Sequence, residues 1–293
     1  MSIMSQLEFE MDFSDSEKQI ARYILEHDDE VLSLSSRELA SKTYTSPATI
    51  VRLCRKLGLK GYDAFKIQYS AELQSHTYSN DEIDVNFPFK ASDSLQEISY
   101  KMSELDNEVV KGTMQLIDYK VLQEVIDHIY NYQYIDIYGS GNSLLAAMSF
   151  EHKMMRINRV VNLKVLHGEE IFMAQNSDEN HLAILISYSG ETADLLRNAK
   201  ILKSRNTKII GITSVGDNEL SRISDLVLNV YSKEKIFSKI APFASQISFE
   251  YLLNIIYSGV FQKDYENNIN HKINNDRLFD NRRPTQSPVK EEG

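Results

Sequence analysis

The stretch ISYSGET (residues 186–192) places three hydroxyl side chains around one glycine, directly after the apolar run LAILI (182–186). A short run rich in β-branched residues that ends in turn residues predicts a buried strand. Similar runs, with helical segments between them, occur at 134–138, 160–166, 208–213 and 226–230. This alternation predicts an α/β fold with a doubly wound parallel sheet.

A second loop of the same kind, YGSGNS (138–143), follows the first of these strands. Glycines let backbone amides approach an anion, and a helix N-terminus adds partial positive charge. Because neighbouring parallel strands end at one edge of a sheet, both loops are expected to meet around one anion, such as a phosphate. A dinucleotide-binding fingerprint is not matched, since Leu144 stands where the third glycine is required. The alternative is that these hydroxyls only cap helices.

The N-terminal part of the chain has the start signals of several short helices. Capping boxes begin at Ser14 and Ser35, and Ser46-Pro47 gives a third helix start. In the third helix, one set of apolar residues shares a stripe at helical spacing: Ile50, Leu53, Cys54 and Leu57. The opposite, outward face then has Thr49, Arg52, Arg55 and Lys56. The segment predicts an all-α bundle containing a helix-turn-helix.

The charge distribution favours DNA as a partner of this bundle. The whole chain has a formal net charge of -10, yet residues 35–66 contain seven Lys and Arg against two carboxylates. A helix-turn-helix reads base edges from the start of its second helix and holds phosphates nearby. We expect base contacts from Thr45, Ser46, Ala48, Thr49 and Arg52, and phosphate contacts from Arg55, Lys56 and Lys60. The alternatives are a solvated charged face, or a surface for an acidic protein partner.

Two resemblances bear on these predictions. Residues 35–66, SSRELASKTYTSPATIVRLCRKLGLKGYDAFK, resemble the N-terminal module of the RpiR family of bacterial transcriptional regulators. The two loops resemble those of the SIS (sugar isomerase) domain, which implies a phosphosugar ligand. The resemblance implies a sugar-phosphate site made of Gly139, Ser140, Gly141, Asn142, Ser143, Ser187, Ser189 and Thr192.

The expected organisation has four parts. Residues 1–77 form the helix-turn-helix domain, 78–124 a linker and connecting helix, 125–263 the SIS domain, and 264–293 a polar, disordered tail. The chain has neither a secretory signal at its start nor an apolar run of membrane-spanning length. We therefore expect a cytoplasmic protein with no membrane partner.

The sequence favours sensing over catalysis. HGEE (167–170) could supply a general base to a sugar-phosphate aldose-ketose isomerase, but its acidic residues equally suit a helix start. The histidines are scattered and Cys54 is the single cysteine, so we expect no metal, no cofactor and no enzyme activity. The leading hypothesis is a DNA-binding transcriptional regulator of sugar metabolism, a homodimer or higher homo-oligomer on double-stranded operator DNA, with a phosphorylated sugar as effector. An isomerase with an accessory helical domain is the alternative.

Overall fold

The computed structural model describes residues 3–8, 13–78, 83–231 and 233–279. The chain divides into two compact units. The first takes its residues from 1–116, 214–217 and 231–244, and the second takes the remainder. Each unit is described separately below.

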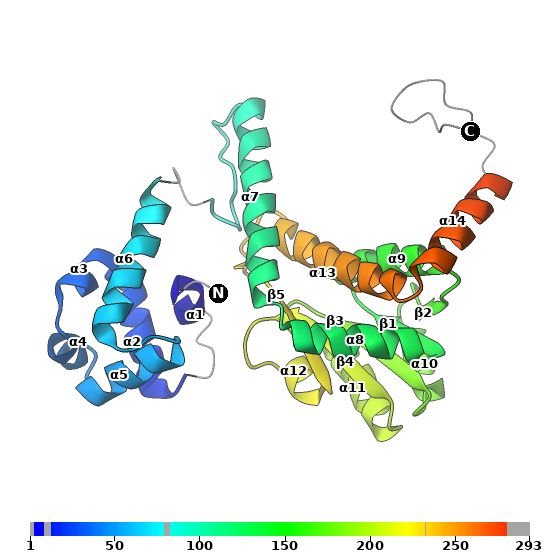
Figure 1. Cartoon of the computed structure of the whole chain (residues 1–293), viewed down its shortest axis with the longest axis horizontal. Helices are drawn as coiled ribbons and strands as arrows, with labels where there is room; N and C mark the ends of the chain where they lie inside the picture. The colour runs from blue at the N-terminus through cyan, green and yellow to red at the C-terminus, as the bar shows by residue number, and fades with distance from the viewer. Residues whose placement is uncertain (1–2, 9–12, 79–82, 232, 280–293) are drawn as a thin grey trace. The chain divides into compact units, whose positions relative to one another are not determined.

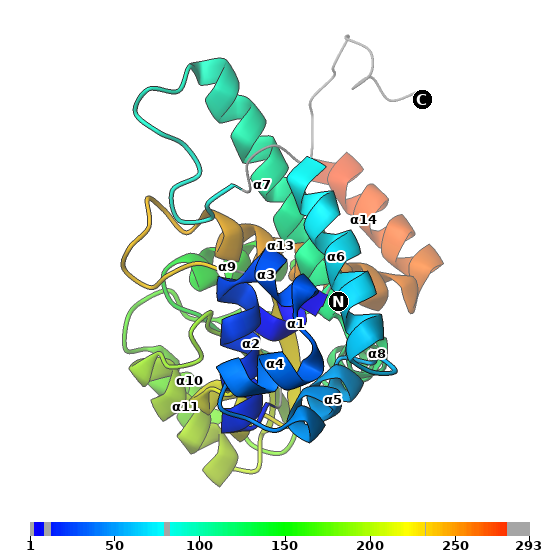
Figure 2. The same cartoon turned by 90° about the vertical axis from the view of Figure 1, so that its left-hand side faces the viewer.

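The first unit is helical, as the sequence predicts (Figure 1). Its helices are α1 (Ile3–Glu8), α2 (Asp15–Glu26), α3 (Asp28–Ser33), α4 (Ser36–Lys42), α5 (Pro47–Lys56), α6 (Tyr62–Tyr78) and α7 (Leu95–Leu116). Both predicted capping boxes are present, and Ser46 caps α5 with Pro47 in its first turn. Figure 2 shows α4 leading through a short turn into α5, which is the predicted helix-turn-helix. The six-residue helices α1 and α3 are too short to show a periodic pattern, so they were not predicted.

The core of this unit confirms the predicted apolar stripe of α5. Ile50, Leu53, Cys54 and Leu57 are all buried in one cluster with side chains of α1, α2, α4 and α6. Burying one such side chain contributes about 1.5–3 kcal/mol, so the stripe fixes how α5 can rotate about its axis.

Part of the predicted linker is ordered against its own unit. Val85 and Asn86 are buried, and the Asn86 side chain accepts a hydrogen bond from the Lys235 amide at 2.7 Å. The Asn86 carbonyl also accepts from the Ile240 amide at 2.9 Å. The sequence gives no signal of these contacts, because the partners of Asn86 lie about 150 residues away along the chain.

The second unit is the predicted doubly wound α/β fold. Its sheet has the order β2-β1-β3-β4-β5, and the pairs β1–β2, β1–β3 and β3–β4 are parallel. The strands are β1 (Tyr134–Tyr138), β2 (Val161–Leu163), β3 (His181–Ile186), β4 (Lys208–Ser214) and β5 (Leu226–Val230). The helices are α8 (Tyr119–Asn131), α9 (Asn142–Met155), α10 (Glu170–Asn176), α11 (Ala193–Ser204), α12 (Glu219–Ile223), α13 (Phe243–Gln262) and α14 (Tyr265–Phe279).

Successive residues of the strands point to opposite faces of the sheet and pack into two hydrophobic cores, one on each face. Ile135, Ile137 and Ile184 pack with α8, α9 and α13, whereas Ala183 and Leu185 pack with α10, α11 and α12 on the opposite face. The chain reverses its winding between β1 and β3, and this switch point is where open α/β sheets bind ligands.

The prediction of a disordered tail is wrong over the first half of that segment. Residues 265–279 form α14, and the remainder of the tail lies outside the described residues. Asp276 of α14 accepts from Arg156, the residue that follows α9, at 2.7 Å, and the Tyr265 ring packs edge-on against Phe261. These contacts with distant or preceding residues stabilise a helix whose polar composition alone predicts disorder. Among the helices that the structure describes, none has the length and hydropathy needed to span a bilayer.

Candidate functional site

The exposed face of α5 is the first candidate site. Ser46, Ala48, Arg52, Arg55 and Lys56 are exposed, as the predicted outward face requires, whereas Thr45 is half-buried. Thr49 is a correction: it is only 9% exposed, and its hydroxyl lies 2.9 Å from the Ser46 hydroxyl. The Thr49 side chain therefore stabilises the start of α5 from the buried face of the helix.

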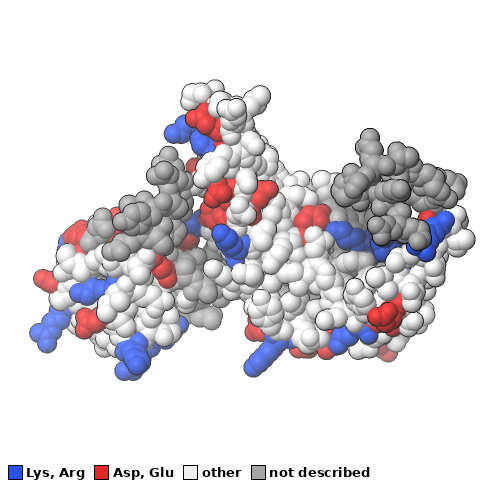
Figure 3. All heavy atoms as spheres, turned by 45° about the horizontal axis from the view of Figure 1, so that its top comes forward, with Lys and Arg blue, Asp and Glu red and all other residues white. Residues whose placement is uncertain are grey.

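Sequence reasoning missed Val51, which is half-buried and lies between Ala48 and Arg55 on the outward side of α5. Lys60 lies four residues after the end of α5 at Lys56, and it is exposed as predicted. On the face of the molecule drawn in Figure 3, basic and acidic side chains are interspersed.

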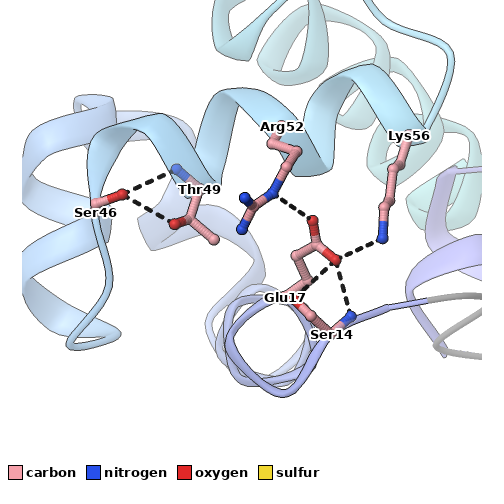
Figure 4. Close-up of polar contacts among 6 residues, drawn as sticks. All are labelled: Ser14, Glu17, Ser46, Thr49, Arg52 and Lys56. Carbon is pink, nitrogen blue, oxygen red and sulfur yellow. Dashed lines mark hydrogen bonds and ion pairs between the residues drawn. The ribbon is translucent and has the colours of Figure 1, made fainter.

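A buried carboxylate on α2 holds two of the predicted DNA-contacting side chains. Glu17 is 1% exposed, and its two oxygens accept from Arg52 Nε at 3.1 Å and from Lys56 Nζ at 2.7 Å (Figure 4). The two terminal nitrogens of Arg52 point away from Glu17, toward the Thr49 end of α5 (Figure 4). The Arg52 side chain is 62% exposed. The contact with Glu17 therefore holds Nε and leaves the rest of the guanidinium accessible to solvent.

The same carboxylate completes the capping box of α2. Glu17 accepts from the Ser14 amide at 2.8 Å and from the Ser14 hydroxyl at 3.0 Å. Burial alone would raise the pKa of Glu17, but the hydrogen bonds from Lys56, Ser14 and Arg52 outweigh it and lower the pKa to about 2. Glu17 is therefore a charged tie between α2 and the predicted reading helix. The sequence marks it as a cap and gives no sign of its partners on α5.

The second candidate site begins with the loop after β1. A Cβ on Gly139 would lie 2.8 Å from the Ser143 backbone, so only glycine lets the loop approach the start of α9 this closely. The Ser143 hydroxyl accepts from the Ser140 amide at 2.9 Å and donates to the Ser140 carbonyl at 2.8 Å. Gly141 has a φ of +57°. The Ser143 side chain thus shapes the loop, as the capping alternative predicts.

The loop after β3 is held in the same way. The buried Ser187 hydroxyl lies 2.9 Å from the Thr192 hydroxyl and accepts from the Gly190 amide at 3.2 Å. The Ser189 hydroxyl accepts from the Glu191 amide at 3.2 Å. Gly190 has a φ of +67°, and a Cβ there would lie 1.9 Å from the Asn218 Oδ1. The hydroxyls of ISYSGET therefore build a tight turn before α11.

The two loops meet at one cavity of about 130 Å³. Gly139, Ser140 and Gly141 line it from the first loop, and Thr192 lines it from the second. The lining does not include the other predicted ligand residues, which are Asn142, Ser143, Ser187 and Ser189. The expected convergence of the loops is confirmed, but fewer of the hydroxyls face the cavity than the sequence predicts.

Two polar side chains that the sequence analysis did not assign to a ligand, Lys164 and Asn198, also line this cavity. Lys164 directly follows β2, so its place after a strand at the same sheet edge was the available signal. Asn198 of α11 is 1% exposed, and its Oδ1 has no hydrogen-bond partner among the described residues. His167 and Glu170 of the HGEE segment line it as well, with 3.9 Å between His167 Nδ1 and Glu170 Oε1. The cavity offers backbone amides, one lysine cation and one unpaired amide oxygen.

Comparisons with known proteins agree with this architecture. The family model "Helix-turn-helix domain, rpiR family" matches residues 1–76, and the SIS domain model matches residues 128–253. An uncharacterized HTH-type transcriptional regulator of Caldanaerobacter subterraneus subsp. tengcongensis is 28% identical over 94% of this chain and 96% of its own length. Another from Clostridium perfringens is 28% identical over 93% of this chain and 97% of its own.

Solved structures share the fold. The Vibrio vulnificus NanR protein, solved in complex with ManNAc-6P, has a TM-score of 0.58 at 22% identity, covering 94% of this chain and 97% of its own. The sugar isomerase domain of the RpiR transcription factor from Sphaerobacter thermophilus has a TM-score of 0.55 at 16% identity, covering 62% of this chain and 100% of its own. The two domains, in this order, and the relatives that match nearly the whole chain place it in the RpiR family of helix-turn-helix transcriptional regulators, with a SIS domain after the helix-turn-helix domain.

Proposed function

We propose that this regulator binds double-stranded operator DNA through α5 and binds a phosphorylated sugar in the cavity between the loops of its SIS domain. The single observation that carries the ligand proposal is the meeting of Gly139–Gly141, Thr192 and Lys164 around one cavity at the switch point of the sheet. Backbone amides at a helix start and a lysine are the groups that bind a phosphoryl group. The NanR protein, which was solved with ManNAc-6P, supports this ligand class.

The sugar part of the ligand has a candidate partner in Asn198. An unpaired amide oxygen in a buried side chain costs free energy, which a hydroxyl donor from the ligand would recover. A ligand whose phosphate binds at the two loops and whose hydroxyls reach Asn198 on α11 would use both parts of the cavity. A phosphosugar has both groups, whereas free phosphate lacks the sugar hydroxyls. Asp194 also lines the cavity, but its carboxylate is paired with Arg197 at 3.0 Å, which offsets its repulsion of an anion.

On the DNA side, exposed Ala48, Arg52 and Arg55 form one outward face of α5. Arg52 supplies donors for base edges, and Arg55 with Lys60 supplies cations for phosphates. Symmetric half-sites require two such helices, so we propose a homodimer or higher homo-oligomer. The effector acts only if it binds one arrangement of the paired readers more tightly than another.

Ligand binding is tested by isothermal titration with a panel of hexose 6-phosphates, including ManNAc-6P, and with the corresponding free sugars as controls. Lys164→Gln is expected to weaken binding of a hit by about tenfold or more, because it removes a charge-assisted hydrogen bond to phosphate. Lys200→Gln is the matched control, since Lys200 lies on α11, is exposed and lies outside the cavity lining. Equal losses in both variants, or equal binding of free sugars, would reject this site.

DNA binding is tested by fluorescence anisotropy with duplexes from the promoter of the neighbouring operon. Binding should be salt-sensitive, and Arg52→Ala should weaken it. A hit from the sugar panel should then change this affinity. Salt-insensitive or absent binding would reject the DNA proposal.

Isomerisation is the second candidate function, and His167 and Glu170 in the cavity lining are the observation in its favour. A general base must reach the proton that moves between two carbons of the sugar. Incubating the protein with aldose phosphates and assaying for ketose tests it. If the protein turns over substrate at enzymatic rates and His167→Gln abolishes this turnover, the role of the cavity is catalysis and not sensing.

A further inference from the structure

Tyr44, in the turn between α4 and α5, combines an unfavourable backbone with a fully displayed side chain. Its φ is +51°, in the left-handed region that favours glycine. Its side chain is nevertheless among the most exposed aromatic ones of the chain, at 90%. The other non-glycine residues with positive φ in the described ranges are Asn158 and Asn206, and asparagine tolerates this conformation well.

The turn itself explains why the backbone adopts this conformation. The Thr45 amide donates to the Ala40 carbonyl at 2.8 Å, and the Tyr44 amide donates to the Ser41 carbonyl at 3.3 Å. These bonds close the end of α4 in the way that a left-handed residue after a helix permits. Glycine or asparagine would serve this turn at lower conformational cost. Because the Tyr44 ring is exposed to solvent, its packing inside its own unit offsets little of the conformational cost of the left-handed backbone.

We propose that Tyr44 is a DNA-contacting residue whose phenol hydroxyl donates to a phosphate of the operator backbone. This inference rests on the proposed DNA-binding function of α5. In a bound helix-turn-helix the first helix crosses the sugar-phosphate backbone and the start of the second enters the major groove. Tyr44 lies in the turn between these two helices, two residues before the α5 cap Ser46. This docking geometry therefore brings the turn next to the DNA strand that borders the groove.

The surroundings of Tyr44 suit an anionic partner. It borders a hollow of about 490 Å³ that is also lined by Lys18, Arg22 and Lys42, with Asp15 and Glu26 as the acidic members. Lys42 also pairs with Glu30 at 2.6 Å. Tyrosine hydroxyls are among the ordinary donors to DNA phosphates, and such contacts add affinity without reading sequence.

The test uses fluorescence anisotropy with a labelled mixed-sequence duplex of about 30 base pairs at about 50 mM salt, where sequence-independent binding is measurable. Tyr44→Phe removes only the hydroxyl and is expected to lower affinity by about tenfold. The slope of affinity against salt should stay that of the wild type, because a neutral hydroxyl releases no counterion. Tyr100→Phe, at an exposed tyrosine of α7, is the matched control with unchanged affinity.

A second variant separates binding from folding. Tyr44→Asn is expected to lose at least as much affinity as Tyr44→Phe while its melting temperature stays the same or rises, since asparagine suits the left-handed turn. Wild-type affinity in Tyr44→Phe, or a lowered melting temperature in Tyr44→Asn, would overturn the inference. A wild-type protein that binds no duplex even at low salt would instead overturn the proposed function.

Discussion

Replacing Glu17 by Gln tests the charged tie between α2 and α5. The capping hydrogen bond to Ser14 can persist, because glutamine keeps an acceptor oxygen, but the charge that faces Arg52 and Lys56 is lost. The pKa of Glu17 is lowered from 4.5 to about 2, and a change of this size corresponds to about 3 kcal/mol of stability. We expect Glu17→Gln to lose up to about 3 kcal/mol at pH 7.

The pH dependence has a defined sign. Because the pKa is lowered in the folded state, the stabilisation is complete well above pH 4.5 and is lost as the pH falls toward 2. The difference between wild type and Glu17→Gln should therefore shrink from about 3 kcal/mol at pH 7 to about 1.5 kcal/mol at pH 3.

Cys54 provides a probe that reports on the helical unit alone, because it is the single cysteine and is buried there. The urea dependence of its labelling by 2,2′-dithiodipyridine gives the free energy of opening. Glu38→Gln is the matched control, since Glu38 caps α4 through Ser35 in the same way but is exposed. Equal losses in the two variants would show that capping and not the ion pairs stabilises this unit, and would refute the reasoning.

Two further predictions concern positions where local geometry sets the outcome. Gly190→Ala should destabilise the SIS domain by about 3 kcal/mol or more, because the new Cβ overlaps Asn218 as well as straining the backbone. Gly168→Ala, with a φ of +90° and open space around it, should cost only about 1 kcal/mol, and equal losses by urea unfolding would contradict the overlap argument. Burial raises the pKa of the Cys54 thiol to about 12, so its alkylation at pH 8 should be about a thousandfold slower in the native than in the unfolded chain. Rapid native labelling by iodoacetamide, followed by mass spectrometry, would contradict this.

Local patterns determined much of the architecture. The capping boxes at Ser14 and Ser35, the cap at Ser46 and the stripe from Ile50 to Leu57 were readable because they depend on residues three or four apart. The strands of the second unit could be predicted because each is a short apolar run. The runs are apolar because helices cover both faces of the sheet. The meeting of the two loops was expected because neighbouring parallel strands end at one edge of a sheet.

The tertiary structure decided which side chains carry the sites. Thr49 belongs to the helix that the sequence predicts, but packing against the rest of its unit turns it inward. Glu17 reaches Arg52 across 35 residues of sequence, and Lys164 and Asn198 reach the cavity from separate elements. Secondary structure depends on neighbours along the chain, which a sequence displays, whereas charge pairing and cavity lining depend on which faces of distant elements meet. Only the packed core fixes those faces.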